Sequence, residues 1–447
     1  MIRTLRTAAL ATVLSAAWAM PLAAQQTSRS PGADAVASRA GTYVIRNATI
    51  VPVVGARIPN GSVVVQNGRI AAVGANVQAP AGATVIDATG MFVFPGMIDG
   101  GTALGLTEIG SVPGPIDTRE IGDFNPQNDA IVAVNASSEL IPVTRVNGVT
   151  TAITGMEGGL VNGTAALIDL EGWVPNEMAA KPQAAMVMSY PSLGGGGFGG
   201  FGGGFGQQRS MAERREAQSR QVRELRAYLS DAKAYAEVRA RNGNRAPGRV
   251  NQAMEAMIPV VRGELPVIFD VEAADQIRGV LSLADSFGIK PVLRGAREAW
   301  MLADTLAARR IPVIVGPLTQ VPGGSDPYDM LFANPAALVR AGVKIAFQTG
   351  DAAESRNLPY NAGLAVGFGL SADEAMKALT INAAEIFGVA DRYGSIEPGK
   401  VANLVVANGE ILDTRTQVRH VFIRGTPLPM NDRHTELYER YRARPKP

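Results

Sequence analysis

Short apolar runs of strand length alternate with longer stretches of helical periodicity, from about residue 92 to about residue 388. This rhythm is typical of a parallel sheet covered by helices. About 300 residues of it favour eight βα units over a small open sheet. We therefore predict an α/β fold with a TIM-type (β/α)8 barrel over residues 91–390. The expected strands include Met91–Ile98, Thr150–Thr154, Ala185–Met188, Val267–Val271, Pro291–Leu293, Ile311–Val315 and Lys344–Phe347.

The flanks of this region have a β-like pattern. Before it, the apolar runs Gly61–Val65 and Arg69–Val73 are separated by Asn67-Gly68, the strongest short-range signal for a two-residue hairpin turn. After it, short alternating runs return. Residues 42–90 and 391–430 are therefore predicted to form one composite β-sandwich from the two ends of the chain.

The N-terminus has the pattern of a secretory signal peptide. Arg3 and Arg6 precede an apolar run, Ala8–Met20, and small residues follow up to Ala24. A retained membrane anchor is the alternative, but the run is shorter than the ~20 apolar residues that a spanning helix needs. We expect residues 1–24 to be removed, residues 25–41 to form a flexible tail, and the protein to be exported, periplasmic or secreted, with no membrane span after cleavage.

Two segments interrupt the barrel rhythm. Gly194–Gly206 is glycine-rich but lacks the Lys-Ser/Thr pair of a phosphate-binding loop, so a flexible insertion is the better interpretation. Arg209–Arg241 carries mixed charge around one apolar face, which indicates a helix packed on the core rather than a nucleic-acid surface. Residues 431–447 form a charged tail with a helical pattern.

Composition excludes several kinds of chemistry. The formal charge of +2 is too balanced to favour nucleic acid as a partner. With 0 cysteines the chain has no disulfide, no thiolate metal site and no cysteine nucleophile. Only 2 histidines occur in 447 residues, too few for a multi-histidine metal site.

Two signatures far apart in the chain carry a family resemblance. The turn Phe94–Asp99, and the segments Leu379–Gly388 and Gly394–Leu404 near the other end, resemble the amidohydrolase superfamily of metal-dependent, imidazolonepropionase-like hydrolases. The resemblance extends from about Thr42 to Gly425. It implies a (β/α)8 barrel with a composite β-sandwich, and hydrolysis of non-peptide C–N bonds, in amides or cyclic amides, by metal-activated water.

The resemblance also implies a site made of one or two divalent metals, histidine ligands, commonly a carboxylated lysine, and a catalytic aspartate. The His-x-His pair of the family falls on Gly101 and Ala103, the fifth-strand histidine near Asp270, and the sixth-strand histidine on Ala296 or Arg297. None of these positions has a histidine.

Two carboxylates complete the expected set. The position of the bridging lysine corresponds to Asp169, and Asp351 alone keeps the residue type of the family, which makes it the candidate catalytic residue. The cofactor is therefore undetermined: the family implies a divalent metal, but the histidine ligands are missing.

Two interpretations of the aspartates remain open. Asp169, Asp270 and Asp351 could gather at the barrel mouth and hold Mg²⁺, Ca²⁺ or Mn²⁺. Alternatively, Asp99 caps its turn and the other carboxylates pair with arginines such as Arg294 and Arg297, because like charges brought together need a counter-charge. The second interpretation is preferred.

Other catalytic patterns are weak. His420 lies in an alternating strand and His434 in the charged tail, so both are expected to be structural. There is no Gly-x-Ser-x-Gly elbow. A pair of acids for glycoside hydrolysis remains a remote alternative.

Three functional hypotheses follow. The chain is an impaired or non-catalytic accessory member that binds a small molecule, pairs with an active amidohydrolase paralogue or self-associates. Alternatively, it is a hydrolase with a carboxylate-only metal site. Thirdly, it is an interaction protein that uses the glycine-rich insertion and the Arg209–Arg241 helix as a contact surface.

Overall fold

A computed structural model describes residues 41–193, 210–243, 250–321 and 327–444. The predicted signal peptide, almost all of the predicted N-terminal tail and the glycine-rich insertion lie outside these residues. Within the described part, no helix combines the length and apolar character needed to cross a membrane.

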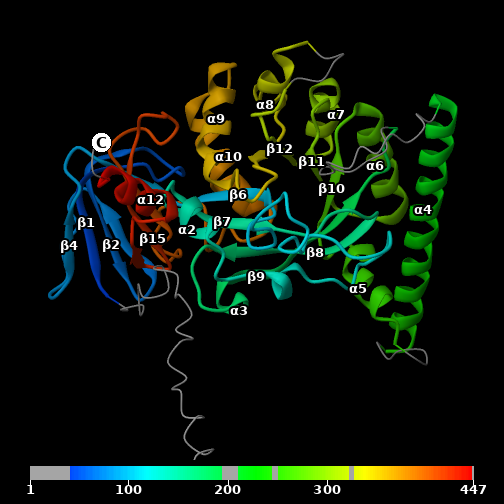
Figure 1. The fold of residues 1–447 in the computed structure, drawn as a ribbon, viewed down its shortest axis with the longest axis horizontal. Coiled ribbons are helices and arrows are strands. Elements are labelled where there is room, and N and C mark those ends of the chain that lie inside the picture. The colour runs from blue at the N-terminus through cyan, green and yellow to red at the C-terminus, as the bar shows by residue number, and fades with distance from the viewer. Residues whose placement is uncertain (1–40, 194–209, 244–249, 322–326, 445–447) are drawn as a thin grey trace, which may run out of the picture. The chain divides into compact units, whose positions relative to one another are not determined.

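Eight strands form one sheet in the order in which they follow along the chain, which confirms the predicted barrel class. Its first and last strands meet, because the backbone N–H of Gly350 donates to the carbonyl oxygen of Gly101 at 2.9 Å. Figure 1 shows the strands running through the middle of the molecule with helices beside them. The strands are β6 (Met97–Thr102), β7 (Val149–Thr154), β8 (Val161–Asp169), β9 (Ala179–Ser189), β10 (Val267–Val271), β11 (Pro291–Gly295), β12 (Val313–Val315) and β13 (Ile345–Phe347).

The third strand departs from a regular (β/α)8 pattern. β8 is antiparallel to both β7 and β9, and all nine of its residues are buried. The link from Thr154 to Val161 is too short for the helical crossover that a parallel connection requires, so the chain turns straight back on itself. As a result, the carboxyl end of β8 points toward the end of the barrel where the other strands begin.

Helices cover the outside of the barrel. The predicted amphipathic helix exists as α4, which begins with a capping box between Ser210 and Glu213. α4 packs against α5 and α6 (Figure 1). The barrel helices are α1 (Ala130–Ala133), α2 (Leu140–Arg145), α3 (Pro175–Met178), α4 (Met211–Arg241), α5 (Gln252–Val261), α6 (Ala274–Phe287), α7 (Ala303–Ala308), α8 (Met330–Arg340), α9 (Leu358–Gly367), α10 (Ala372–Leu379) and α11 (Ile381–Ile386). In the charged tail, α12 (Arg433–Arg442) has no buried residue.

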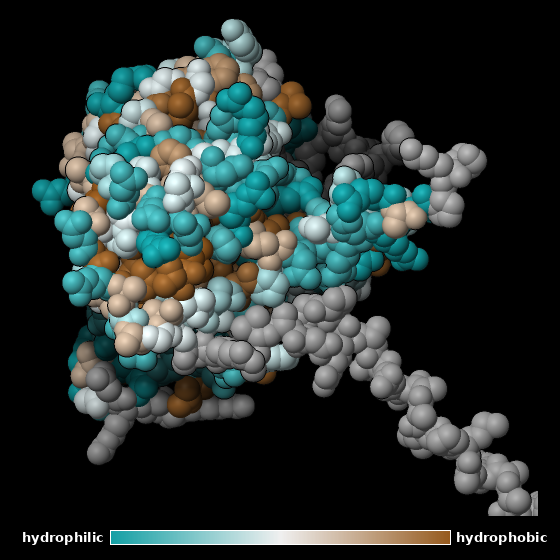
Figure 2. Space-filling model, turned by 90° about the vertical axis from the view of Figure 1, so that its left-hand side faces the viewer, coloured by the Kyte–Doolittle hydropathy of each residue, from teal (hydrophilic) through white to brown (hydrophobic). Residues whose placement is uncertain are grey.

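A second sheet combines strands from both ends of the described chain, as predicted. β2 and β3 form the expected hairpin, with Asn67 and Gly68 both at positive φ in its turn. Figure 2 shows one side of the molecule, on which hydrophilic residues predominate and hydrophobic residues gather in a band. The strands are β1 (Tyr43–Ile50), β2 (Ile58–Gln66), β3 (Arg69–Gly74), β4 (Thr84–Asp87), β5 (Phe92–Pro95), β14 (Leu404–Ala407), β15 (Val418–Ile423) and β16 (Thr426–Leu428).

A buried polar cluster joins the barrel to the second sheet. Asp169, at the end of β8, is 1% exposed and accepts hydrogen bonds from Asn403 Nδ2 at 2.9 Å, Tyr393 Oη at 3.1 Å and Thr151 Oγ1 at 3.3 Å. The Arg424 guanidinium lies 3.8 Å from the same carboxylate. Burial raises the pKa of Asp169, although these partners oppose the shift.

Replacing Asp169 with Ala should destabilise the fold. The change leaves the Asn403, Tyr393 and Thr151 donors without their acceptor, and a buried group without a partner costs about 1–3 kcal/mol. We expect a loss of roughly 3 kcal/mol in the free energy of unfolding, measured with urea, and a smaller loss for Asp169→Asn. A loss below about 0.5 kcal/mol, within the range of ordinary surface substitutions, would contradict this role.

Candidate ligand-binding site at the barrel mouth

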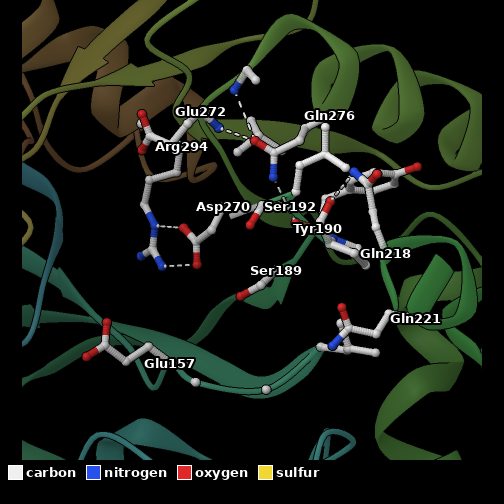
Figure 3. A pocket seen from close by; sticks show the side chains of 18 of the residues that line it. Glu157, Ser189, Tyr190, Ser192, Gln218, Gln221, Asp270, Glu272, Gln276 and Arg294 are labelled. Carbon is white, nitrogen blue, oxygen red and sulfur yellow. Dashed lines mark hydrogen bonds and ion pairs between the residues drawn. The ribbon is translucent and has the colours of Figure 1, made fainter. Parts of the chain in front are cut away.

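A cavity of about 1120 Å³ lies at the carboxyl ends of the barrel strands. The ends of β6, β10, β11 and β13 form one wall, and the first half of α4 forms the other. Figure 3 shows Glu157, Asp270 and Arg294 on one side, with Gln218 and Gln221 of α4 facing them. The polar residues that line it are Thr102, Asp123, Glu157, Ser189, Tyr190, Ser192, Arg214, Gln218, Arg220, Gln221, Asp270, Glu272, Asp275, Gln276, Arg294, Arg297 and Gln348.

An ion pair between neighbouring strands stands at the inner wall. Arg294 on β11 donates through Nε and Nη2 to the two carboxylate oxygens of Asp270 on β10, at 2.5 and 2.8 Å (Figure 3). The parallel register places these residues directly opposite each other. The side chains are 12% and 32% exposed, so the pair is shielded from water on the arginine side. This bidentate geometry is the strongest form of such a contact.

Arg294 also faces other carboxyl groups. Burial lowers the pKa of its guanidinium, but the carboxylates of Asp270, Glu157 and Asp99 outweigh that effect and the pKa is raised overall. Arg294 is therefore a permanently charged group, and it is the cation around which these acids are arranged.

Two glutamates in the cavity are perturbed by burial. Glu157 follows β7, and burial raises the pKa of its carboxyl group while Arg294 opposes the shift. Glu272 follows β10, and burial raises its pKa to about 7 against the opposing effect of Arg297. Both groups therefore keep a proton at higher pH than a solvated glutamate does, which suits them to proton transfer.

Asp99 lies below the cavity and is fully buried. Its carboxylate accepts from the backbone N–H groups of Gly101 at 3.0 Å and Thr349 at 3.2 Å, and from Thr349 Oγ1 at 2.5 Å. Burial raises its pKa to about 7, although these hydrogen bonds oppose the shift. Asp99 thus caps its turn, as expected, and also links the first barrel strand to the last.

Gln348 fills the space beside Gly101. Its Nε2 donates to the carbonyl oxygen of Gly316 at 2.7 Å, which leaves Oε1 directed toward Gly101. A Cβ atom added to Gly101 would lie 2.5 Å from this Oε1 and 3.1 Å from Cδ of Arg294. The position of the first family histidine is therefore closed to a side chain as the cavity stands.

The predicted aspartate cluster does not form, and the reason is the direction of β8. Asp169 pairs with Thr151 at the start of β7, so it lies at the opposite end of the barrel from the cavity, and its place in a mouth cluster was wrong. Asp351 is exposed, and its Oδ1 accepts from the backbone N–H of Ala353 at 2.8 Å. Only Asp270 of the three lines the cavity.

The two histidines lie where the sequence predicts. His420 is in β15 of the second sheet, and His434 is in α12, beside the guanidinium of Arg356. Neither lines the cavity.

Comparisons with known proteins agree with this architecture. Residues 332–428 match the profile described as the amidohydrolase family. An amidohydrolase structure from Thermotoga maritima is 28% identical, with a TM-score of 0.76 over 87% of this chain and 99% of that one. The profile match and this structural likeness support the amidohydrolase superfamily for this chain.

Two curated relatives match shorter segments of the chain. Imidazolonepropionase of Geobacillus kaustophilus is 41% identical over 80 residues, which is 17% of this chain and 19% of the relative. 5-Methylthioadenosine/S-adenosylhomocysteine deaminase of Thermodesulfovibrio yellowstonii is 32% identical over 130 residues, 23% of this chain and 30% of the relative. Each match spans less than a third of the relative's own length.

The residues at this mouth do not fit the metal that the amidohydrolase superfamily implies. Gly101 and Ala103 have no donor atom, and the guanidinium of Arg294 stands among the acids. Within the described part of the chain, no three His, Asp or Glu side chains come together as a metal site. Asp270 is bound to a cation already, so a second positive charge beside Arg294 would be repelled.

Three residues of the site were missed from the sequence. Glu157, Glu272 and Gln348 each follow a barrel strand within a few residues. In a (β/α)8 barrel such positions carry the functional side chains, so the strand ends were a usable signal.

Stability should fall with rising pH because of Asp99. Its pKa rises from 3.8 to about 7 on folding, so between these values the folded chain holds a proton that the unfolded chain has released. The stabilising contribution is complete below the lower value and is lost as pH approaches the upper one. Each pH unit in this window corresponds to about 1.4 kcal/mol for one group.

The variant Asp99→Asn isolates this effect. We expect it to gain roughly 2–3 kcal/mol relative to the parent chain between pH 5 and pH 7, measured by urea unfolding at each pH. Asp87→Asn is the control: hydrogen bonds from Thr89 and Asn47 lower the pKa of this exposed carboxyl, so no such gain is expected. A pH-independent difference between Asp99→Asn and the parent would show that Asp99 does not titrate in this range.

Proposed function

We propose that this amidohydrolase-superfamily protein binds a small polar molecule in the cavity at the barrel mouth, without a metal-held water. The volume of about 1120 Å³ is slightly above that of typical small-molecule sites, which are ~300–1,000 Å³, so a small molecule has room to enter. Its position at the carboxyl ends of the strands is where barrel proteins bind their ligands.

The observation that carries the proposal is a pair of unused hydrogen-bond acceptors at the inner wall. Among the described residues, no hydrogen bond is made to the carboxyl group of Glu157 or to Oε1 of Gln348. Both residues line the cavity, so a donor on a bound ligand would find these acceptors available.

Binding is tested by calorimetric titration with 5′-methylthioadenosine and imidazolonepropionate, chosen from the names of the two curated relatives. We expect at least one compound to bind, with an affinity that EDTA does not change. Gln221→Trp, which places a bulky ring in the cavity wall, should weaken binding roughly tenfold or more, about 1.4 kcal/mol.

Glu224→Trp is the matched control, because Glu224 lies on the same helix but is exposed and does not line the cavity. It should leave the affinity unchanged. Equal affinity in Gln221→Trp and Glu224→Trp would place the binding elsewhere, and loss of binding in EDTA would contradict metal independence.

A second candidate is hydrolysis of C–N bonds by the glutamates themselves. The pKa of Glu272, raised to about 7, suits it to deliver or accept a proton near neutral pH. The chemistry would be that of the superfamily, with acid–base groups in place of a metal.

This candidate predicts turnover of either compound, followed by ultraviolet absorbance, that persists in EDTA. Glu272→Gln should lower the rate at least ~100-fold, since general acid–base catalysis contributes about 10²–10⁴. Glu216→Gln on the exposed face of α4 should leave it unchanged. If the parent chain binds a compound but does not turn it over, the hydrolysis candidate is contradicted and only the binding function stands.

A further inference from the structure

We infer that the guanidinium of Arg294 occupies the place, and supplies the positive charge, of the metal ion that this barrel architecture otherwise holds. Its two hydrogen bonds to Asp270 fix it at the end of β11, in the wall of the cavity. The negative charges of Glu157, after β7, and Asp99, in β6, also act on this guanidinium, so acids from three parts of the barrel share one cation.

Gly101 makes this arrangement sterically possible. The Cβ position of a larger residue would come within 3.1 Å of Arg294 Cδ and 3.4 Å of Arg294 Nη1. Any side chain at position 101 would therefore displace Arg294, Gln348 or both. The missing histidine and the buried arginine are thus two parts of one change, in which a ligand is removed and a permanent cation takes the vacated space.

If Arg294 replaces the charge of a metal ion, removing Arg294 should allow a metal ion to bind. If Arg294 is shortened, Asp270 and Glu157 lose their common counter-charge while Gln348 Oε1 still points into the gap. Two carboxylates and an amide oxygen are ligands that suit Mn²⁺. We expect the parent chain not to bind this ion at the site, and we expect a variant with a shorter side chain at position 294 to bind it.

The test titrates Mn²⁺ into metal-free full-length protein and follows the free ion by electron paramagnetic resonance. We expect Arg294→Ala to bind one Mn²⁺ at least roughly tenfold more tightly than the parent. Arg294→Lys keeps the charge and should behave like the parent. Arg294→Ala with Asp270→Asn should lose the gained site.

A second experiment asks whether the gap left by Arg294 accepts a metal ion or only another guanidinium group. Thermal unfolding of Arg294→Ala is measured with Mn²⁺ and with methylguanidinium. Stabilisation by Mn²⁺ supports the inference. Stabilisation by methylguanidinium alone overturns it, because the gap would then fit only a guanidinium.

Solubility serves as the readout if Arg294→Ala does not fold in metal-free buffer. Expression with millimolar Mn²⁺ should then restore soluble protein, and failure to do so counts against the inference. Mn²⁺ binding by the parent chain that Asp270→Asn abolishes would also overturn it.

The geometry at Gly101 gives an independent check. Gly101→His alone should not create a Mn²⁺ site, because Arg294 and Gln348 occupy the space. Gly101→His combined with Arg294→Ala should bind Mn²⁺ more tightly than Arg294→Ala. Equal binding in the two would show that position 101 does not face the gap. These outcomes do not depend on whether 5′-methylthioadenosine or imidazolonepropionate binds.

Discussion

The closure of the barrel between its first and last strands is the constraint on which the site depends. The segment that follows β13 is joined to β6 by the hydrogen bond from Gly350 to Gly101 and by Asp99, which accepts from the backbone N–H of Thr349. This places the end of β6 beside Gln348 and Arg294. Without that closure, the cavity would have no inner wall.

Inside this frame, electrostatics determines which side chains can be neighbours. Several acids lie close together at the mouth, and a barrel interior is a poor solvent for charge. Two physical solutions are combined here: Arg294 neutralises Asp270 directly, while Asp99 and Glu272 hold protons up to about pH 7. The mouth is thus balanced by the chain's own groups.

Much of the fold was predictable because it follows from local patterns. The βα rhythm, the Asn67-Gly68 turn and the apolar stripe of α4 each depend on neighbouring residues, and the structure confirms all three. β8 was missed because Asn162-Gly163 near its start is typical of a turn rather than of a strand interior.

The site was harder to predict than the fold. The error at Asp169 followed from β8, since the direction of a strand decides at which end of the barrel its last residue lies. That Asp270 would pair with an arginine could be predicted from the sequence, because several carboxylates close together need a positive charge. Arg294 was one of the two arginines named from the sequence as a counter-charge, and its ion pair with Asp270 confirms it. Which of the two lies opposite Asp270 depends on strand register, which the sequence does not encode locally.

The two halves of α4 meet different demands. Its buried residues, Leu225, Leu229, Ala232 and Ala236, begin near the middle of the helix, whereas Arg214, Gln218 and Gln221, which line the cavity, all precede them. Substitutions before Leu225 therefore disturb little packing. Changes along these first turns would alter the lining of the cavity while the barrel stays as it is.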